Sequence, residues 1–223
     1  YLLYAATAVG VYFLAARILP WFVALCAAML FAAHPVHVEA VALGVGQSEL
    51  LVALFALAMT SHYILARRRG ALRSRDWAWL LVLYVLASLT KEQGILLPAL
   101  LIAAEVLLFP EPARPRVGQL WRGYAVLAGV AIAIVLWRRS ILGGQFAGAA
   151  VAEALEGLGP GGRMLMMLKV APEWVRLLLW PAYLQADYSP QEIVPSGAFG
   201  PSEALGLLLA SGAAVAGGWG RRR

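Results

Sequence analysis

The chain of 223 residues is 62% hydrophobic and only 13% charged, and its mean hydropathy is +0.76. A soluble domain usually has about 45–50% apolar and about 25% charged residues, so this composition excludes an ordinary water-soluble fold. The net charge of +6 does not indicate nucleic-acid binding, because the arginines fall in loops between apolar runs, where they set membrane topology. A single cysteine, Cys26, excludes an internal disulfide. The sequence therefore predicts an integral membrane protein.

Apolar runs along the chain predict an all-α, polytopic membrane helix bundle with about seven spans, forming a single membrane domain over residues 1–223. The clearest span is 49–66, because its 18 residues are close to the roughly 20 that a hydrocarbon core requires. The predicted spans are 2–16, 21–33, 49–66, 77–89, 95–109, 124–137 and 205–219.

Short interfacial or re-entrant helices are predicted between these runs. Pro35 suits the first position of a helix capped by His34, since no hydrogen bond is lost there. Gly44 and Gly46 interrupt that helix before the next span. Residues 164–181 predict an amphipathic helix, in the membrane interface or packed inside the bundle, because charges recur there at helical spacing. These charges are Lys169, Glu173 and Arg176.

The basic residues predict the orientation of the bundle. If the arginine-rich turn at 67–75 is cytoplasmic, twelve of the 18 lysines and arginines fall on that side and six on the other. The positive-inside rule requires this bias. The polar segments 34–39 and 90–94 then open on the opposite side. We therefore predict a multi-pass protein of the cell membrane whose site faces the periplasm or the exterior.

His34, His37 and Glu39 form a polar group at the end of a membrane-type segment. A charged side chain at the centre of a bilayer costs about 2.5–3.5 kcal/mol, so such groups usually face a protein interior or a water-filled cavity. Three interpretations remain open for the histidines. They can cap and hydrogen-bond within the bundle, bind the phosphate of a lipid carrier at a helix N-terminus, or hold a divalent metal through their His-x-x-His spacing.

Lys91 and Glu92 lie at a predicted helix break on the same side of the membrane. They can form an internal salt bridge between two half-helices, or Lys91 can pair with a phosphate while Glu92 orients it or a hydroxyl acceptor. Asp187 follows an apolar helix and is either a catalytic carboxylate or the former of an Asx-turn. The sequence contains no P-loop, nucleophile elbow or dinucleotide fingerprint, and nothing in it requires a cofactor.

Three motifs resemble a known family. The first is FAAHPVHVEAVA at 31–42, followed by GQSELL at 46–51. The second is LTKEQGI at 89–95, and the third is LWP at 179–181 followed by DYS at 187–189. In this order they resemble the membrane region of the transmembrane and tetratricopeptide-repeat O-mannosyltransferases and their bacterial relatives.

The resemblance implies a GT-C-type glycosyltransferase fold. Such enzymes take a sugar, typically mannose, from a polyprenyl or dolichyl phosphate and transfer it to a protein hydroxyl on the non-cytoplasmic face. The expected partners are therefore the lipid bilayer, a polyprenyl-phosphate sugar donor and a protein acceptor. A carboxylate would deprotonate the acceptor while cations stabilise the departing phosphate. The implied residues are Glu39, Glu92 and Asp187 for catalysis, and His34, His37 and Lys91 for the donor phosphate.

The chain departs from the family at three points. The acidic residues of the first extracytoplasmic loop would precede Tyr1, Gln47 stands where relatives often carry arginine, and the C-terminal repeats are not present. We therefore expect an N-terminally truncated fragment or an inactive copy. The alternative functions are a non-catalytic membrane scaffold for repeat or partner proteins of envelope glycan assembly, and a transporter. Discontinuous helices permit a transporter, but the pseudo-symmetric halves that would favour one are not visible.

Overall fold

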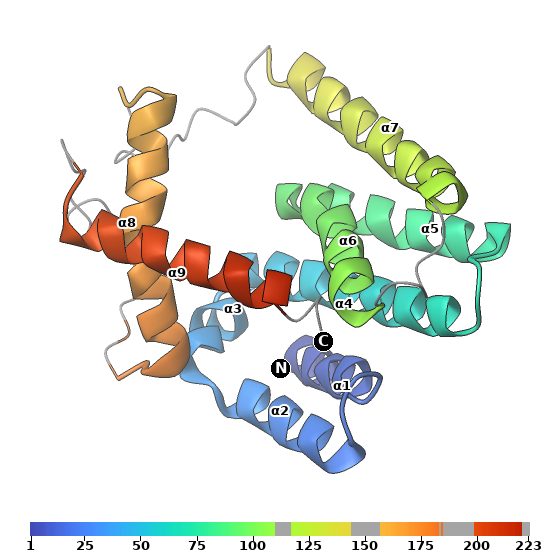
Figure 1. Cartoon of the computed structure of the whole chain (residues 1–223), viewed down its shortest axis with the longest axis horizontal. Coiled ribbons are helices and arrows are strands. Elements are labelled where there is room, and N and C mark those ends of the chain that lie inside the picture. The colour runs from blue at the N-terminus through green and yellow to red at the C-terminus, as the bar shows by residue number, and fades with distance from the viewer. Residues whose placement is uncertain (110–116, 144–156, 183, 185–198, 220–223) are drawn as a thin grey trace. The chain divides into compact units, whose positions relative to one another are not determined.

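The structure is a computed structural model that describes residues 1–109, 117–143, 157–182, 184 and 199–219 (Figure 1). Every regular element in these residues is helical, which confirms the predicted all-α class. The helices are α1 (Leu2–Ala15), α2 (Trp21–Ala33), η1 (Pro35–His37), α3 (Val38–Ala42), η2 (Gly44–Gly46), α4 (Gln47–Arg68), α5 (Ser74–Thr90), η3 (Glu92–Leu96), α6 (Leu97–Leu108), α7 (Val117–Ile141), α8 (Pro160–Leu179) and α9 (Pro201–Trp219). The chain divides into two compact units, Tyr1–Trp137 and Arg138–Arg223.

Fewer helices can cross a membrane than the seven that were predicted. Within the described residues, Gln47–Arg68 and Leu120–Ile141 are long and apolar enough, and α2 with Pro35–Ala42 adds a third span if the pair, bent by 50°, crosses together. Helices α1, α2, α5 and α6 have only 14, 13, 17 and 12 residues. At about 1.5 Å per residue they extend about 18–26 Å, short of a hydrocarbon core of about 30 Å. The prediction was wrong in number because apolar runs were counted without regard to helix length.

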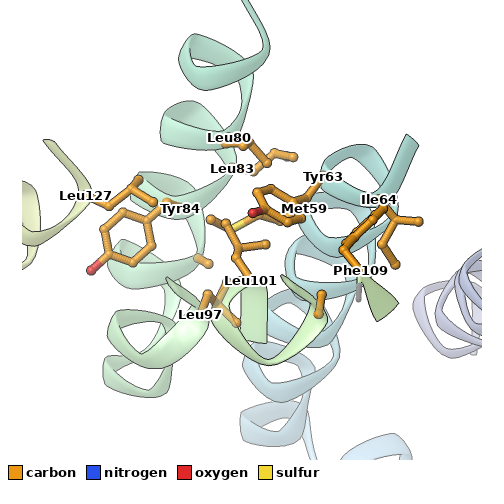
Figure 2. Close-up of a cluster of buried hydrophobic side chains, with 12 residues drawn as sticks. Met59, Tyr63, Ile64, Leu80, Leu83, Tyr84, Leu97, Leu101, Phe109 and Leu127 are labelled. Carbon is orange, nitrogen blue, oxygen red and sulfur yellow. The ribbon is translucent and has the colours of Figure 1, made fainter. Parts of the chain in front are cut away.

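Helix α4 is the central element of the first unit, since it packs against α1, α5 and α6. The buried core lies where α4, α5 and α6 meet the first half of α7 (Figure 2). Its fully buried side chains come from all four helices, and they include Met59, Tyr63, Leu80, Tyr84, Leu101 and Leu127. Because residues so far apart in sequence exclude solvent together, this core fixes the direction of α4 and hence the positions of both its ends.

A polar network closes one end of this core. Arg67 forms a bidentate pair with Glu105, in which Nε and an Nη nitrogen each lie 2.9 Å from a carboxylate oxygen. Tyr63 donates to the same carboxylate at 2.8 Å, and Tyr124 donates to the Tyr63 hydroxyl at 3.3 Å. The Arg67 guanidinium also lies 5.0 Å from the centre of the Phe109 ring. Arg67, interpreted from the sequence as a topology-setting loop residue, is therefore a buried tie between α4 and α6.

Gly94 lets η3 lie directly on the end of α5. A Cβ atom at Gly94 would be 2.4–2.5 Å from backbone atoms of Ala87 and Ser88, a separation that side chains do not tolerate. The close approach places Lys91 at the corner between the two helices, where the Gly94 N–H donates to the Lys91 carbonyl at 2.9 Å. The glycine is thus required by packing and not by an unusual backbone angle.

We expect Gly94→Ala to destabilise the chain by about 1–3 kcal/mol, the usual penalty of overpacking a filled site. The matched control is Gly129→Ala in α7, where a Cβ would meet no atom within 4 Å. Alanine there should be neutral or stabilise the helix by up to about 1 kcal/mol. Thermal unfolding midpoints of both variants in the same detergent measure the difference. Equal midpoints for the two variants would contradict the packing that brings Lys91 to its corner.

Candidate functional site

Three chargeable side chains from separate segments line one cavity of the first unit. Glu39 comes from α3, Glu49 from the first turn of α4, and Lys91 from the corner between α5 and η3. The cavity has a volume of about 270 Å³, and Val36 is among its apolar wall residues. The Lys91 ammonium forms an ion pair with the Glu49 carboxylate. The sequence motifs around residues 34–51 and 89–95 therefore meet in space.

The local sequence explains how these side chains come together. Gly46 packs on α3, because a Cβ there would be 2.6 Å from the backbone of Ala40. This contact folds α3 and η2 back against the start of α4, so Glu39 and Glu49 face one cavity. Lys91 reaches it because its backbone is extended (φ −157°, ψ 150°) and ends α5 there.

The cavity is lined by two carboxylates and one ammonium group, so one carboxylate has no counter-charge among these three side chains. The ion pair is partly open to solvent, with 26% of the Lys91 side chain and 39% of the Glu49 side chain exposed. A partly exposed pair contributes little to stability, typically about 0–1 kcal/mol. Glu49 therefore positions Lys91 through a weak ion pair. An anion that enters the cavity can compete with Glu49 for the ammonium.

The two histidines lie beside this cavity, not in it. They line a neighbouring cavity of about 440 Å³ together with Tyr4. His34 caps η1, where its Nδ1 accepts from the Val36 N–H at 3.3 Å, so the predicted cap is confirmed. The His37 ring packs 4.2 Å from the centre of the Phe31 ring. Residues of the segment 35–42 line both cavities, with Glu39 on the side of Lys91 and His37 on the side of Tyr4.

Of the two remaining predicted site residues, only Glu92 lies among the described residues, and the structure does not bring it to the cavity. Glu92 begins η3 and is exposed, and the cavity wall does not include it. Asp187 lies outside the described residues. Within the part of the chain that the structure describes, no three histidine, cysteine, aspartate or glutamate residues are grouped to hold a metal ion. His34 and His37 therefore have no third protein ligand there.

Sequence reasoning missed Glu49 as the partner of Lys91. Glu49 was interpreted only as the start of a spanning helix, since its 42-residue separation from Lys91 gives no local signal. A usable signal did exist. Glu49 is the last polar residue before a long apolar run, and Lys91 is an isolated cation at the end of another. Two opposite charges at the ends of neighbouring apolar helices favour a pair.

About a third of the chain is similar to proteins named protein O-mannosyl-transferases. It is 49% identical over 76 residues to Protein O-mannosyl-transferase TMTC4 of Homo sapiens, covering 32% of this chain and 10% of that protein. It is 41% identical over 83 residues to Protein O-mannosyl-transferase TMTC3 of Homo sapiens, covering 36% of this chain and 9% of that protein. It is 38% identical over 74 residues to Protein O-mannosyl-transferase F38B6.6 of Caenorhabditis elegans, covering 33% of this chain and 10% of that protein.

The matched segment is thus about a tenth of the length of each of these curated relatives. No family model matches the chain. No solved structure matches it either. The similarity supports a relation to the O-mannosyltransferases over that third of the chain, in agreement with the resemblance of the motifs.

Proposed function

We propose that this chain is part of a multi-pass membrane glycosyltransferase that transfers a sugar from a polyprenyl-phosphate donor to a protein hydroxyl. The observation that carries the proposal is the cavity in which Lys91, Glu49 and Glu39 meet. The protein acceptor and the mannose follow from the names of the relatives, which are protein O-mannosyl-transferases. A scaffold without catalysis has no need for an excess carboxylate beside a displaceable lysine.

The proposed reaction is an inverting displacement. A carboxylate takes the proton of the acceptor hydroxyl, whose oxygen then attacks the anomeric carbon of the sugar. The bond between that carbon and the phosphate oxygen breaks, and the lipid phosphate leaves with an additional negative charge. Glu39 is the candidate base within the cavity, while Glu92 and Asp187 stay candidates for the assembled site. Lys91 receives the phosphate, and His34 and His37 support the donor from the neighbouring cavity.

The length of α4 supports an orientation in which the cavity faces away from the cytoplasm. Glu49 and Arg67 lie 18 positions apart on one helix, so at about 1.5 Å per residue they are separated by about 27 Å along its axis. This distance is close to a hydrocarbon core of about 30 Å. If α4 crosses the membrane, the cavity and the arginine-rich turn lie at opposite ends of the crossing, and the positive-inside rule favours the cytoplasm for the turn.

Donor binding by the full chain in lipid nanodiscs tests the proposal. Polyprenyl-phosphate mannose should bind with saturation, and free mannose should not compete. We expect His37→Ala to weaken this binding about tenfold, because the imidazole and its aromatic neighbours shape the wall against the donor. In the intact protein the same variant should lower transfer at limiting donor by at least the same factor. The matched control is His62→Ala, since His62 pairs with Asp76 at the arginine-rich end of α4. Absence of saturable donor binding in the wild-type chain would refute the proposal.

A non-catalytic membrane scaffold is the second candidate function. The observation that favours it is that Lys91 already has a carboxylate partner, because such a pair can connect α4 to α5 without binding any donor. A scaffold should not distinguish polyprenyl-phosphate mannose from polyprenyl alcohol. The nanodisc experiment with both lipids therefore separates the two functions.

A further inference from the structure

We propose that a groove between α5 and α7 binds an anionic phospholipid, with one acyl chain in the groove and the phosphate held at Arg122. The groove lies within the first unit and has a volume of about 450 Å³. This is within the range of about 300–1,000 Å³ that is usual for small-molecule sites. It uses neither the carboxylate and lysine cavity nor the histidines, so it goes beyond the proposed transfer activity.

The groove has a rigid floor and an accessible wall. A Cβ at Gly123 would be 2.3 Å from the Trp77 indole, so α7 lies directly on that ring. Tyr124 holds the indole from the side, with ring centres 5.6 Å apart. Beyond this contact the space is bounded by Leu81 and Val126, and Val126 is 52% exposed. An extended apolar chain can therefore enter from the surface of the bundle without displacing buried side chains.

Among the described lining residues, the groove has one cationic side chain. Arg122 and Ser74 line it, and both are exposed. The remaining lining side chains are apolar or aromatic, so the described residues offer one positive group beside an apolar surface. That arrangement matches an amphiphile with a single anionic head and does not match a free inorganic phosphate, which has no use for the apolar wall.

A basic segment beside Arg122 adds to the positive charge near the groove. The neighbouring turn from Arg67 to Asp76 carries five arginines and one aspartate. Arg67 is paired with Glu105, and Asp76 is paired with Arg69. Although burial favours the neutral acid, the backbone N–H of Arg73 and the positive charge of Arg69 lower the pKa of Asp76, so it stays ionised. The turn nevertheless retains a net positive charge, which attracts anionic headgroups.

Native mass spectrometry of the full chain, after exchange into phosphatidylglycerol or phosphatidylcholine with identical acyl chains, tests the site. We expect one retained phosphatidylglycerol per chain and about fivefold less phosphatidylcholine, as one favourably placed arginine provides. Arg122→Gln should remove the preference between the two lipids. Val126→Trp should fill the groove and remove the retained lipid. The matched controls are Arg68→Gln, an exposed arginine of the neighbouring basic turn, and Leu136→Trp at another exposed position of α7.

The controls decide between a specific site and general surface attraction. If Arg68→Gln removes the preference as fully as Arg122→Gln, the attraction is spread over the basic turn and the proposal fails. Retention of lipid by Val126→Trp at the wild-type level would also overturn it. Equal retention of both lipids by the wild-type chain would show that the groove recognises only the acyl chain. Competition by glycerol phosphate without acyl chains would assign the site to a free phosphate and contradict the role of the groove.

Discussion

Replacing Lys91 by alanine is expected to lower sugar transfer by the intact protein about 10²–10³-fold, the usual effect of removing one group that stabilises a developing negative charge. The variant loses the ammonium that receives the lipid phosphate, and it leaves Glu39 and Glu49 as unopposed carboxylates in the cavity. Those carboxylates would repel the phosphate, so donor binding should weaken as well. The measurement is transfer from polyprenyl-phosphate mannose, with donor binding followed in the same nanodiscs.

One further substitution separates a catalytic lysine from a structural one. Glu49→Gln breaks the ion pair but keeps the ammonium. Donor binding should survive in this variant or strengthen, while Lys91→Ala should weaken it. A purely structural role predicts that the two variants behave alike, with similar losses of thermal stability and similar donor binding. Wild-type turnover of Lys91→Ala would remove the residue from the mechanism.

Replacing Glu105 by alanine is expected to destabilise the first unit by about 3–5 kcal/mol. The substitution would leave the Arg67 guanidinium without its carboxylate, although its side chain is only 4% exposed. It would also remove the acceptor of the Tyr63 hydroxyl. An uncompensated buried charge is far more costly than the loss of a solvated pair. Equilibrium unfolding in mixed micelles, monitored by helical circular dichroism, measures the change.

The appropriate comparison is Glu173→Ala in α8, which breaks an exposed pair with Arg176. Both side chains of that pair are about one-third exposed, and its loss should change stability by no more than about 1 kcal/mol. The double variant Arg67→Met with Glu105→Leu should recover most of the stability lost in Glu105→Ala, because no buried charge remains. If the single Glu105 variant unfolds like the wild type, the network does not fasten α6 to α4.

The local features of the fold could be predicted from the sequence, whereas its long-range pairings could not. The cap at His34 follows from a polar side chain before Pro35, and the helix breaks near Gly46 and Lys91 follow from interrupted apolar runs. Each of these signals is contained within a few residues. The pairs of Glu49 with Lys91 and of Arg67 with Glu105 join residues 42 and 38 positions apart. A one-dimensional pattern can favour a pair, as the positions of Glu49 and Lys91 at the ends of apolar runs do, but it does not determine which of several charges meet.

The number of spans was mispredicted for a different physical reason. Apolar composition shows only that a segment can lie in a nonpolar environment, whereas crossing a bilayer also requires a minimum helix length. In α6 the apolar residues extend beyond the helix, because η3 takes up Ile95 and Leu96 before α6 begins at Leu97. Asp187, the remaining catalytic candidate, lies outside the described residues and stays a prediction.

The rigid axis of α4 makes its two ends geometrically dependent on each other. Glu49 must face Lys91 at one end, while Arg67 must face Glu105 at the other. Inserting or deleting one residue between them would rotate one end by about 100° relative to the other, so both pairs could not form together. The number of residues between Glu49 and Arg67 is therefore constrained, and it can change only if one of the two ion pairs is lost.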